Sequence, residues 1–140
     1  MWFLIVCSIP LKSQNERLQS GPMLGPITLR DATIWVQAKQ VGIIQIEYKV
    51  KNSLGEFIQS KPSVAEAEDR HTVSIHLENL IPGTTYEYKV KINNDYIKVT
   101  YPLEFTTQEH WAFRKNAPDF SFVAGTCFYI NDTTYDRPGK

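Results

Sequence analysis

Apolar and polar residues alternate along much of this sequence between positions 20 and 107, and this alternation limits the fold more than any other feature. Residues 32–38, 44–50, 73–77 and 86–92 each place an apolar side chain at every second position. A period of two puts alternate side chains on opposite faces of a strand, so each run predicts a β-strand with one buried face.

Turn-forming residues separate these runs, at positions 52–55, 82–83 and 93–95. About seven short strands, each with one apolar face, need a second sheet to cover them, so the pattern predicts an all-β sandwich. Residues 63–70 are the only stretch of this region with helix-forming content, and they are too few to form an independent helix. We expect a loop there, with at most one turn.

The composition fits one packed domain and argues against two classes of partner. The chain has 140 residues, of which 42% are hydrophobic, enough for one ordinary core. Its 15 basic residues balance 15 acidic ones, with no cationic cluster. Neither nucleic acid nor an anionic membrane would be attracted over a distance, so we expect no nucleic-acid partner.

The N-terminal residues 2–10 form an apolar run that is followed by polar residues. This pattern is typical of the hydrophobic part of an export signal ending near Ser13, and a buried N-terminal strand is the alternative. The run is shorter than the roughly 20 residues of a membrane-spanning helix, so no stable membrane span is expected. Bulky Val6 before Cys7 argues against a lipoprotein. We interpret residues 1–19 as a signal-peptide remnant and leader of a secreted, periplasmic or cell-surface protein.

Residues 80–90 contain a corner motif. Pro82 and Gly83 turn the chain, and the hydroxyl of Tyr86 can then reach a backbone group upstream, which is the arrangement called a tyrosine corner. The segment resembles the E–F corner of fibronectin type III and immunoglobulin-like domains. This resemblance implies a fold and carries no information about function.

The alternation ends after Thr107. Residues 109–118 break the alternation and include the charged residues Glu109, Arg114 and Lys115, and residues 120–128 then form a nearly continuous apolar run. Such a run suits a strand that is buried on both faces, as in a sheet covered by helices. We therefore expect a sandwich domain at residues 20–108, a linker at 109–118 and the start of an α/β domain, truncated here, at 119–140.

Two groups of motifs carry a family resemblance. Residues 20–25 and 32–37 are similar to the start of the accessory domain of PhoD-like alkaline phosphatases and phosphodiesterases, and to the N-terminal domain of purple acid phosphatases. Residues 122–127, 129–131 and 135–139 resemble the first strand and following loop of the metallophosphoesterase domain of the PhoD-like family. Thr126 stands where that family more usually has serine, a change that keeps the hydroxyl.

The resemblance implies a phosphate-ester hydrolase whose catalytic site holds iron and calcium, with Cys127 as an iron ligand. Such a cluster polarises a phosphoryl oxygen and lowers the pKa of a bound nucleophile. The alternative is that Cys127 is a small buried hydrophobic residue. One thiolate cannot hold several metals, so the other ligands must follow Lys140, and we expect residues 1–140 to be catalytically inert.

Other polar residues are weaker candidates. His71, His76 and His110 lack the spacing of metal ligands. Asp132 and Asp136 could contact the ligands of a metal site, but aspartates in loops more often stabilise turns. Residues 131–133 match an N-glycosylation acceptor, a tripeptide that is common by chance.

Trp35 is predicted on the strand face opposite Ala32, Ile34 and Val36. A large aromatic side chain there is exposed unless something covers it, so we expect an intramolecular contact between Trp35 and the catalytic domain. An ordinary surface aromatic, or an error in strand register, is the alternative. A stand-alone fibronectin type III-like module for binding or adhesion is the alternative function for the whole chain.

Overall fold

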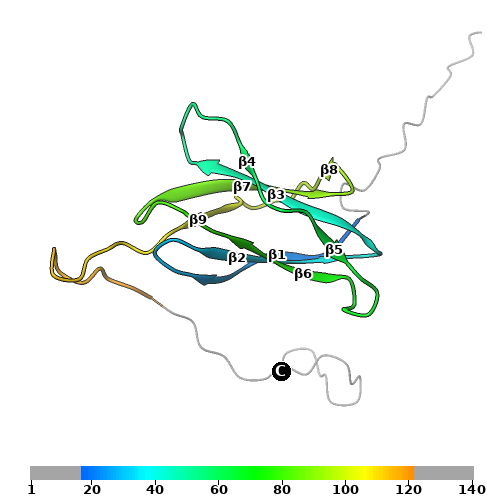
Figure 1. Cartoon of the computed structure of the whole chain (residues 1–140), viewed down its shortest axis with the longest axis horizontal. Coiled ribbons are helices and arrows are strands. Elements are labelled where there is room, and N and C mark those ends of the chain that lie inside the picture. Colours follow the sequence, from blue (N-terminus) through cyan, green and yellow to red (C-terminus); the bar gives the residue numbers. More distant parts are fainter. Residues whose placement is uncertain (1–16, 122–140) are drawn as a thin grey trace, which may run out of the picture. The chain divides into compact units, whose positions relative to one another are not determined.

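The structure is a computed structural model, and it describes residues 17–121. Cys7, Cys127 and the segments predicted as a signal peptide and as a metallophosphoesterase strand from residue 122 onward lie outside the described residues. The chain divides into two units, residues 1–110 and 111–140. The described part of the first unit is the sandwich (Figure 1). In the described part of the second unit, residues 112–114 form a turn in which the Arg114 N–H donates to the Trp111 carbonyl over 2.9 Å.

Nine strands build the described part of the first unit, and they form two antiparallel sheets (Figure 1). One sheet has the order β1-β2-β6, and the other has the order β4-β3-β7-β8, with β5 also paired to β3 and β9 to β7. The predicted all-β sandwich is confirmed, and residues 17–121 contain no helix. The strands are β1 (Leu18–Ile27), β2 (Ala32–Ala38), β3 (Gly42–Val50), β4 (Ile58–Gln59), β5 (Ser63–Ala65), β6 (Thr72–Leu77), β7 (Thr85–Ile92), β8 (Asp95–Tyr96) and β9 (Glu104–Thr106).

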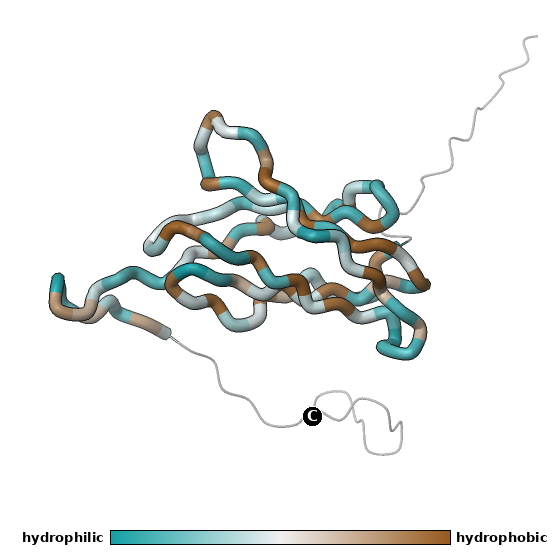
Figure 2. The backbone as a smooth tube through the Cα atoms, viewed as in Figure 1, coloured by the Kyte–Doolittle hydropathy of each residue, from teal (hydrophilic) through white to brown (hydrophobic). Residues whose placement is uncertain are grey.

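The predicted alternation is what places the core between the sheets. Along β2, Ala32, Ile34 and Val36 are buried, whereas Thr33 and Trp35 on the opposite face are half-buried. The same alternation is visible along the tube in Figure 2. The largest fully buried apolar side chains come from both sheets and from the loop after β6: Ile34, Val36, Leu77, Ile44, Ile46, Val90, Ile92 and Leu80.

The turns lie where turn-forming residues predicted them. Asn52, Asn93, Asn94 and Gly83 have φ values of 62°, 51°, 68° and 63°. Asparagine and glycine adopt this left-handed conformation at the lowest steric cost, so each of these residues suits its turn.

The prediction of a loop at residues 63–70 is wrong at its start. Residues 63–65 form β5, with Ser63 opposite Ile44 and Ala65 opposite Gly42. Pairing with the backbone of β3 outweighs the helical preference of this short segment, as tertiary context commonly does. The expected turn does form next, where the Arg70 N–H donates to the carbonyl of Ala67.

Two strands depart from a simple seven-strand pattern. β1 begins at Leu18, two residues before the predicted start of the sandwich domain, and its pairing with β2 shifts register three times. The last strand of the second sheet is split into β8 and β9. Ile97 and Leu103 still hydrogen-bond to β7, and residues 98–102 between them leave the ladder.

Candidate functional site

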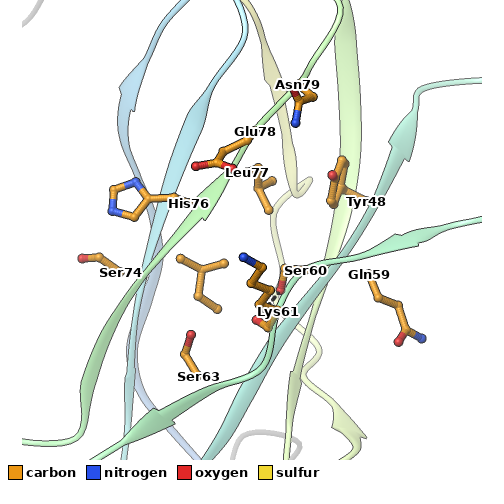
Figure 3. A pocket seen from close by; sticks show the side chains of 11 residues that line it. Tyr48, Gln59, Ser60, Lys61, Ser63, Ser74, His76, Leu77, Glu78 and Asn79 are labelled. Atoms are coloured by element: carbon orange, nitrogen blue, oxygen red, sulfur yellow. Dashed lines mark hydrogen bonds between the residues drawn. The ribbon is translucent and has the colours of Figure 1, made fainter.

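A cavity of about 380 Å³ lies between β6 and the connection from β4 to β5 (Figure 3). Its floor consists of core side chains, from Tyr48, Ile75 and Leu77. Polar residues form its two sides. The wall on the β4–β5 side contains Ser60, Lys61 and Ser63, and the β6 side contains Ser74, His76, Glu78 and Asn79. We call this cavity the β6 slot.

Ser60 holds the β4–β5 wall in place. Its backbone N–H donates to the Ile46 carbonyl over 2.8 Å, and its hydroxyl accepts the Ile46 N–H over 3.0 Å. Gln45 adds a hydrogen bond from Nε2 to the Ser60 carbonyl over 2.9 Å. The Ser60 hydroxyl takes the place of a backbone carbonyl as acceptor in the ladder, so regular pairing is interrupted here. The backbone pairs with β3 again when β5 begins at Ser63.

The floor of the slot is apolar except for one phenol. Tyr48 is only 8% exposed, and burial together with the nearby Tyr86 raises the pKa of its hydroxyl. Burial disfavours the charged phenolate, so this side chain stays neutral at physiological pH. The slot therefore offers a neutral, mostly apolar floor between two polar walls.

A second polar cluster lies on the outer face of the β3–β7 sheet and is centred on Glu47. This carboxylate is 6% exposed and accepts hydrogen bonds from Lys91 Nζ at 3.0 Å, Tyr96 Oη at 2.8 Å and Gln59 Nε2 at 3.1 Å. The hydrogen bond from Lys91 is the largest cause of a lowered pKa for Glu47, against an opposing effect of burial. A buried carboxylate with three donors is structurally satisfied, so we assign Glu47 to stability.

An aromatic pair holds a lysine beside this cluster. The Lys89 ammonium lies 4.1 Å from the ring centroid of Phe57 and 5.6 Å from that of Tyr96. Both contacts are of the cation–π type, which favours a cation over the ring face. Phe57 also contacts the Lys49 ammonium, and Tyr96 contacts that of Lys91, so the two rings hold three lysine side chains on the outer face of the sheet.

The last residues of the sandwich, Thr107 and Gln108, form several hydrogen bonds with neighbouring loops. The hydroxyl of Thr107, which is 2% exposed, donates to the Ile81 carbonyl over 2.6 Å and accepts the Thr84 N–H over 3.0 Å. Gln108 donates its backbone N–H to the Thr28 carbonyl over 3.0 Å, and its carbonyl accepts the Gly83 N–H over 2.9 Å. The chain is therefore held firmly to the sandwich as far as Gln108.

The predicted tyrosine corner is present at the same end. The Ile81 N–H donates to the Tyr86 hydroxyl over 2.8 Å, which is the upstream backbone contact expected from the sequence. Tyr86 also stacks on Phe105 of β9, with ring centroids 5.4 Å apart. The corner therefore joins the loop after β6 to the last strand of the sandwich.

Cys127, the predicted metal ligand, lies outside the described residues, as do Asn131, Asp132 and Asp136. Within residues 17–121, no three histidine, cysteine, aspartate or glutamate side chains come together as a metal site would require. His76 instead lies 3.0 Å from the hydroxyl of Thr33, through its Nδ1.

Trp35 lies where the alternation predicts it, on the outer face of β2. It is half-buried, in register with Met23 of β1 on one side and Ser74 of β6 on the other. Part of its cover comes from β1, since a Cβ added to Gly21 would lie 3.5 Å from Cε3 of the indole. Its predicted contact with a catalytic domain stays a prediction.

Sequence reasoning missed the β6 slot and the Glu47 cluster. Both join residues from strands that are distant in sequence, and neither contains a recognisable motif. The one local indication was Pro62, which is poorly suited to the interior of a strand and stands where the chain departs from β3. In the part of the chain described, no helix is long and apolar enough to cross a bilayer.

Comparison with solved structures finds several similar sandwiches. PhoD aligns with a TM-score of 0.52 and 14% identity, over 61% of this chain and 18% of the PhoD chain, so this chain spans less than a fifth of PhoD. The sensor domain of the anti-sigma factor RsgI4 in Pseudobacteroides cellulosolvens aligns with a TM-score of 0.50 and 16% identity, over 76% of this chain and 89% of that domain. These two likenesses show the sandwich fold. A human fibronectin type III domain, from the KIAA0970 protein, aligns with a TM-score of 0.46 and 14% identity, over 81% and 88% of the two chains.

No curated protein matches the sequence. A family profile does match, over residues 15–110, which is more than half of the chain and includes all nine strands. The chain therefore belongs to the family described as a domain of unknown function, DUF7800.

Proposed function

We propose that this sandwich is the N-terminal accessory domain of a secreted, metal-dependent phosphoric ester hydrolase that resembles PhoD. The order of segments along the chain supports this proposal. A sandwich whose fold is shared with PhoD ends at the anchored residues Thr107 and Gln108. Residues 122–139 then carry the motifs that resemble the start of a metallophosphoesterase domain.

In this proposal the sandwich supports the catalytic domain and takes no part in the chemistry. Cys127 would hold iron, and residues after Lys140 would complete a site with iron and calcium. The bound metals would polarise the phosphoryl group of a phosphate ester. Trp35 would contact the catalytic domain from the outer face of β2. The apolar run at residues 2–10 would direct export.

The test uses the complete gene product, beginning with the coding sequence after Lys140. We expect several hundred further codons that include acidic and histidine metal ligands. The purified product should contain iron and calcium by elemental analysis. Cys127→Ser should lose most of the iron, and Ser121→Ala, a nearby substitution outside the motif, should retain it. A coding sequence that ends at Lys140, or equal iron in the two variants, would contradict the proposal.

A stand-alone binding module is the second candidate function. The observation that favours it is the β6 slot, a lined cavity within the sandwich itself. This function predicts a coding sequence that continues into another sandwich or stops, so the same sequencing step separates the two candidates.

A further inference from the structure

The edges of the two sheets differ in how they are protected against pairing with another strand. Natural edges are commonly short, bulged or interrupted by proline. At the β1 edge, the pairing with β2 shifts register three times, and the strand contains Pro22 and Pro26. In the other sheet, β4, β5, β8 and β9 are two or three residues long.

The edge formed by β6 has none of these features. It is six residues long, pairs with β2 without a register shift, and contains no proline, lysine, arginine, aspartate or glutamate. A regular, uncharged edge of this length is a template for a further strand.

The hydrogen-bond pattern of β2 and β6 shows which backbone groups face this edge. The Ala38 N–H donates to the His71 carbonyl, and this pair continues the register of the ladder. Bonded pairs alternate in an antiparallel ladder, so Val73, Ile75 and Leu77 direct their N–H and carbonyl groups toward β2. Thr72, Ser74 and His76 direct theirs away from it.

Two of these outward-directed residues have no backbone hydrogen-bond partner on their outer side in the described part of the chain. The Thr72 N–H donates to the Asp69 carbonyl. Ser74 and His76 have no backbone hydrogen bond outside the β2–β6 ladder among residues 17–121. Both residues line the β6 slot, and Figure 3 shows their side chains pointing away from Lys61. Their backbone edge therefore faces the cavity.

The β6 slot has the features needed to bind an extended peptide segment. Its edge offers donors and acceptors at the two-residue repeat of a strand backbone. Its apolar floor can take every second side chain of an added strand. The Lys61 ammonium in the opposite wall has no carboxylate partner among the described residues, which favours an acidic group at that side.

We propose that the β6 slot binds an extended segment of a separate polypeptide, which adds as a fourth strand antiparallel to β6. The backbone of Ser74 and His76 pairs with the segment. Ile75, Leu77 and Tyr48 receive its inward side chains, and Lys61 pairs with an acidic residue. This inference is independent of the proposed function.

The test uses residues 1–140 and one synthetic peptide with blocked ends, in which threonine and valine alternate over seven residues and a glutamate follows. NMR hydrogen exchange is measured with and without peptide. We expect the Ser74 and His76 amides to exchange quickly in the free chain and to become at least about tenfold slower with peptide, because each gains a hydrogen bond. Val73, Ile75 and Leu77 should be protected in both states.

Peptide methylation supplies matched controls. Paired residues in an antiparallel ladder share a face, so the outward threonines direct their N–H groups at β6 and the inward valines direct theirs away. N-methylation of three threonines should weaken binding at least about tenfold, whereas N-methylation of three valines should leave it within about twofold. Lys61→Gln should weaken binding by about threefold.

Three results would overturn the proposal. The first is that both methylated peptides bind equally, and the second is that the peptide perturbs other amides and leaves Ser74 and His76 unprotected. The third is protection of these two amides without peptide. If that protection rises with protein concentration, a second copy of the chain occupies the edge, and if it is independent of concentration, another segment of the same chain does.

Discussion

The hydroxyl of Tyr86 accepts the backbone N–H of Ile81 over 2.8 Å, and this single hydrogen bond closes the corner between β6 and β7. Tyr86 is 3% exposed, so water cannot readily replace the hydroxyl as a partner for the Ile81 N–H. The corner adjoins Thr107 and Gln108, which hold the last residues of the sandwich. The rigidity of this end thus depends on a contact that is recognisable in the sequence.

Tyr86→Phe should lower the free energy of unfolding by about 1–2 kcal/mol, because the Ile81 N–H loses its partner while the ring stays packed. Urea denaturation followed by tryptophan fluorescence measures this change. Tyr48→Phe is the matched control, because no described residue hydrogen-bonds the Tyr48 hydroxyl, and it should cost less than about 0.5 kcal/mol. Equal losses in the two variants would contradict the role assigned to the corner.

Thr107→Val should lower the free energy of unfolding by about 2–3 kcal/mol, because it leaves the Ile81 carbonyl and the Thr84 N–H without their side-chain partner. Thr107→Ser keeps the hydroxyl and loses one methyl group, so it should cost about 1 kcal/mol. Thermal unfolding of both variants gives the comparison. A valine variant at least as stable as the serine variant would show that burial at position 107 matters and hydrogen bonding does not.

Glu47 should make the sandwich less stable in acid. The hydrogen bond from Lys91 lowers the pKa of Glu47 below its ordinary value. A lowered pKa in the folded state contributes stability that is present above the unfolded pKa and is lost as the pH falls through the folded value. Urea denaturation at a series of pH values from 6 down to about 3 should show this loss, given the ordinary glutamate pKa. Glu47→Gln should flatten this dependence, and an unchanged slope in that variant would contradict the assignment.

Tyr88 should make the sandwich less stable in alkali. It is 5% exposed, and burial, with a smaller effect of Tyr101, raises its pKa to about 12. The folded state therefore holds its proton above the ordinary tyrosine pKa of about 10, and stability should fall as the pH rises from that value through about 12. Absorbance titration at alkaline pH should show late tyrosinate transitions, and Tyr88→Phe should remove one of them. Loss of an early transition instead would contradict the assignment.

The sequence predicted the parts of the fold that follow from local pattern. Alternation located β2, β3, β6 and β7, and Pro82–Gly83 with Tyr86 located the corner. β1 was harder to recognise as a strand because its glycine and proline residues interrupt the pattern. β5 pairs with β3 over only three residues, which no local pattern indicates.

The candidate sites were less predictable, for a physical reason. Glu47 occupies an outward position of β3 and reads as an ordinary solvated residue. Its burial comes from Gln59, Lys91 and Tyr96, which lie on three other strands. Which backbone groups of β6 point away from β2 depends on which residues form the hydrogen-bonded pairs of the ladder. Strand order and register decide this. Strand order and register cannot be read from the β6 segment alone.

We propose that this sandwich belongs to a metal-dependent phosphate-ester hydrolase, and the activity of the complete protein tests this proposal. The most direct measurement is the rate of hydrolysis of a chromogenic phosphodiester by the complete gene product, with iron and calcium present and then after chelation, beside residues 1–140 under the same conditions. We expect turnover by the complete product that chelation abolishes, and none by residues 1–140. Turnover by residues 1–140, or a complete product that shows no metal-dependent turnover, would contradict it.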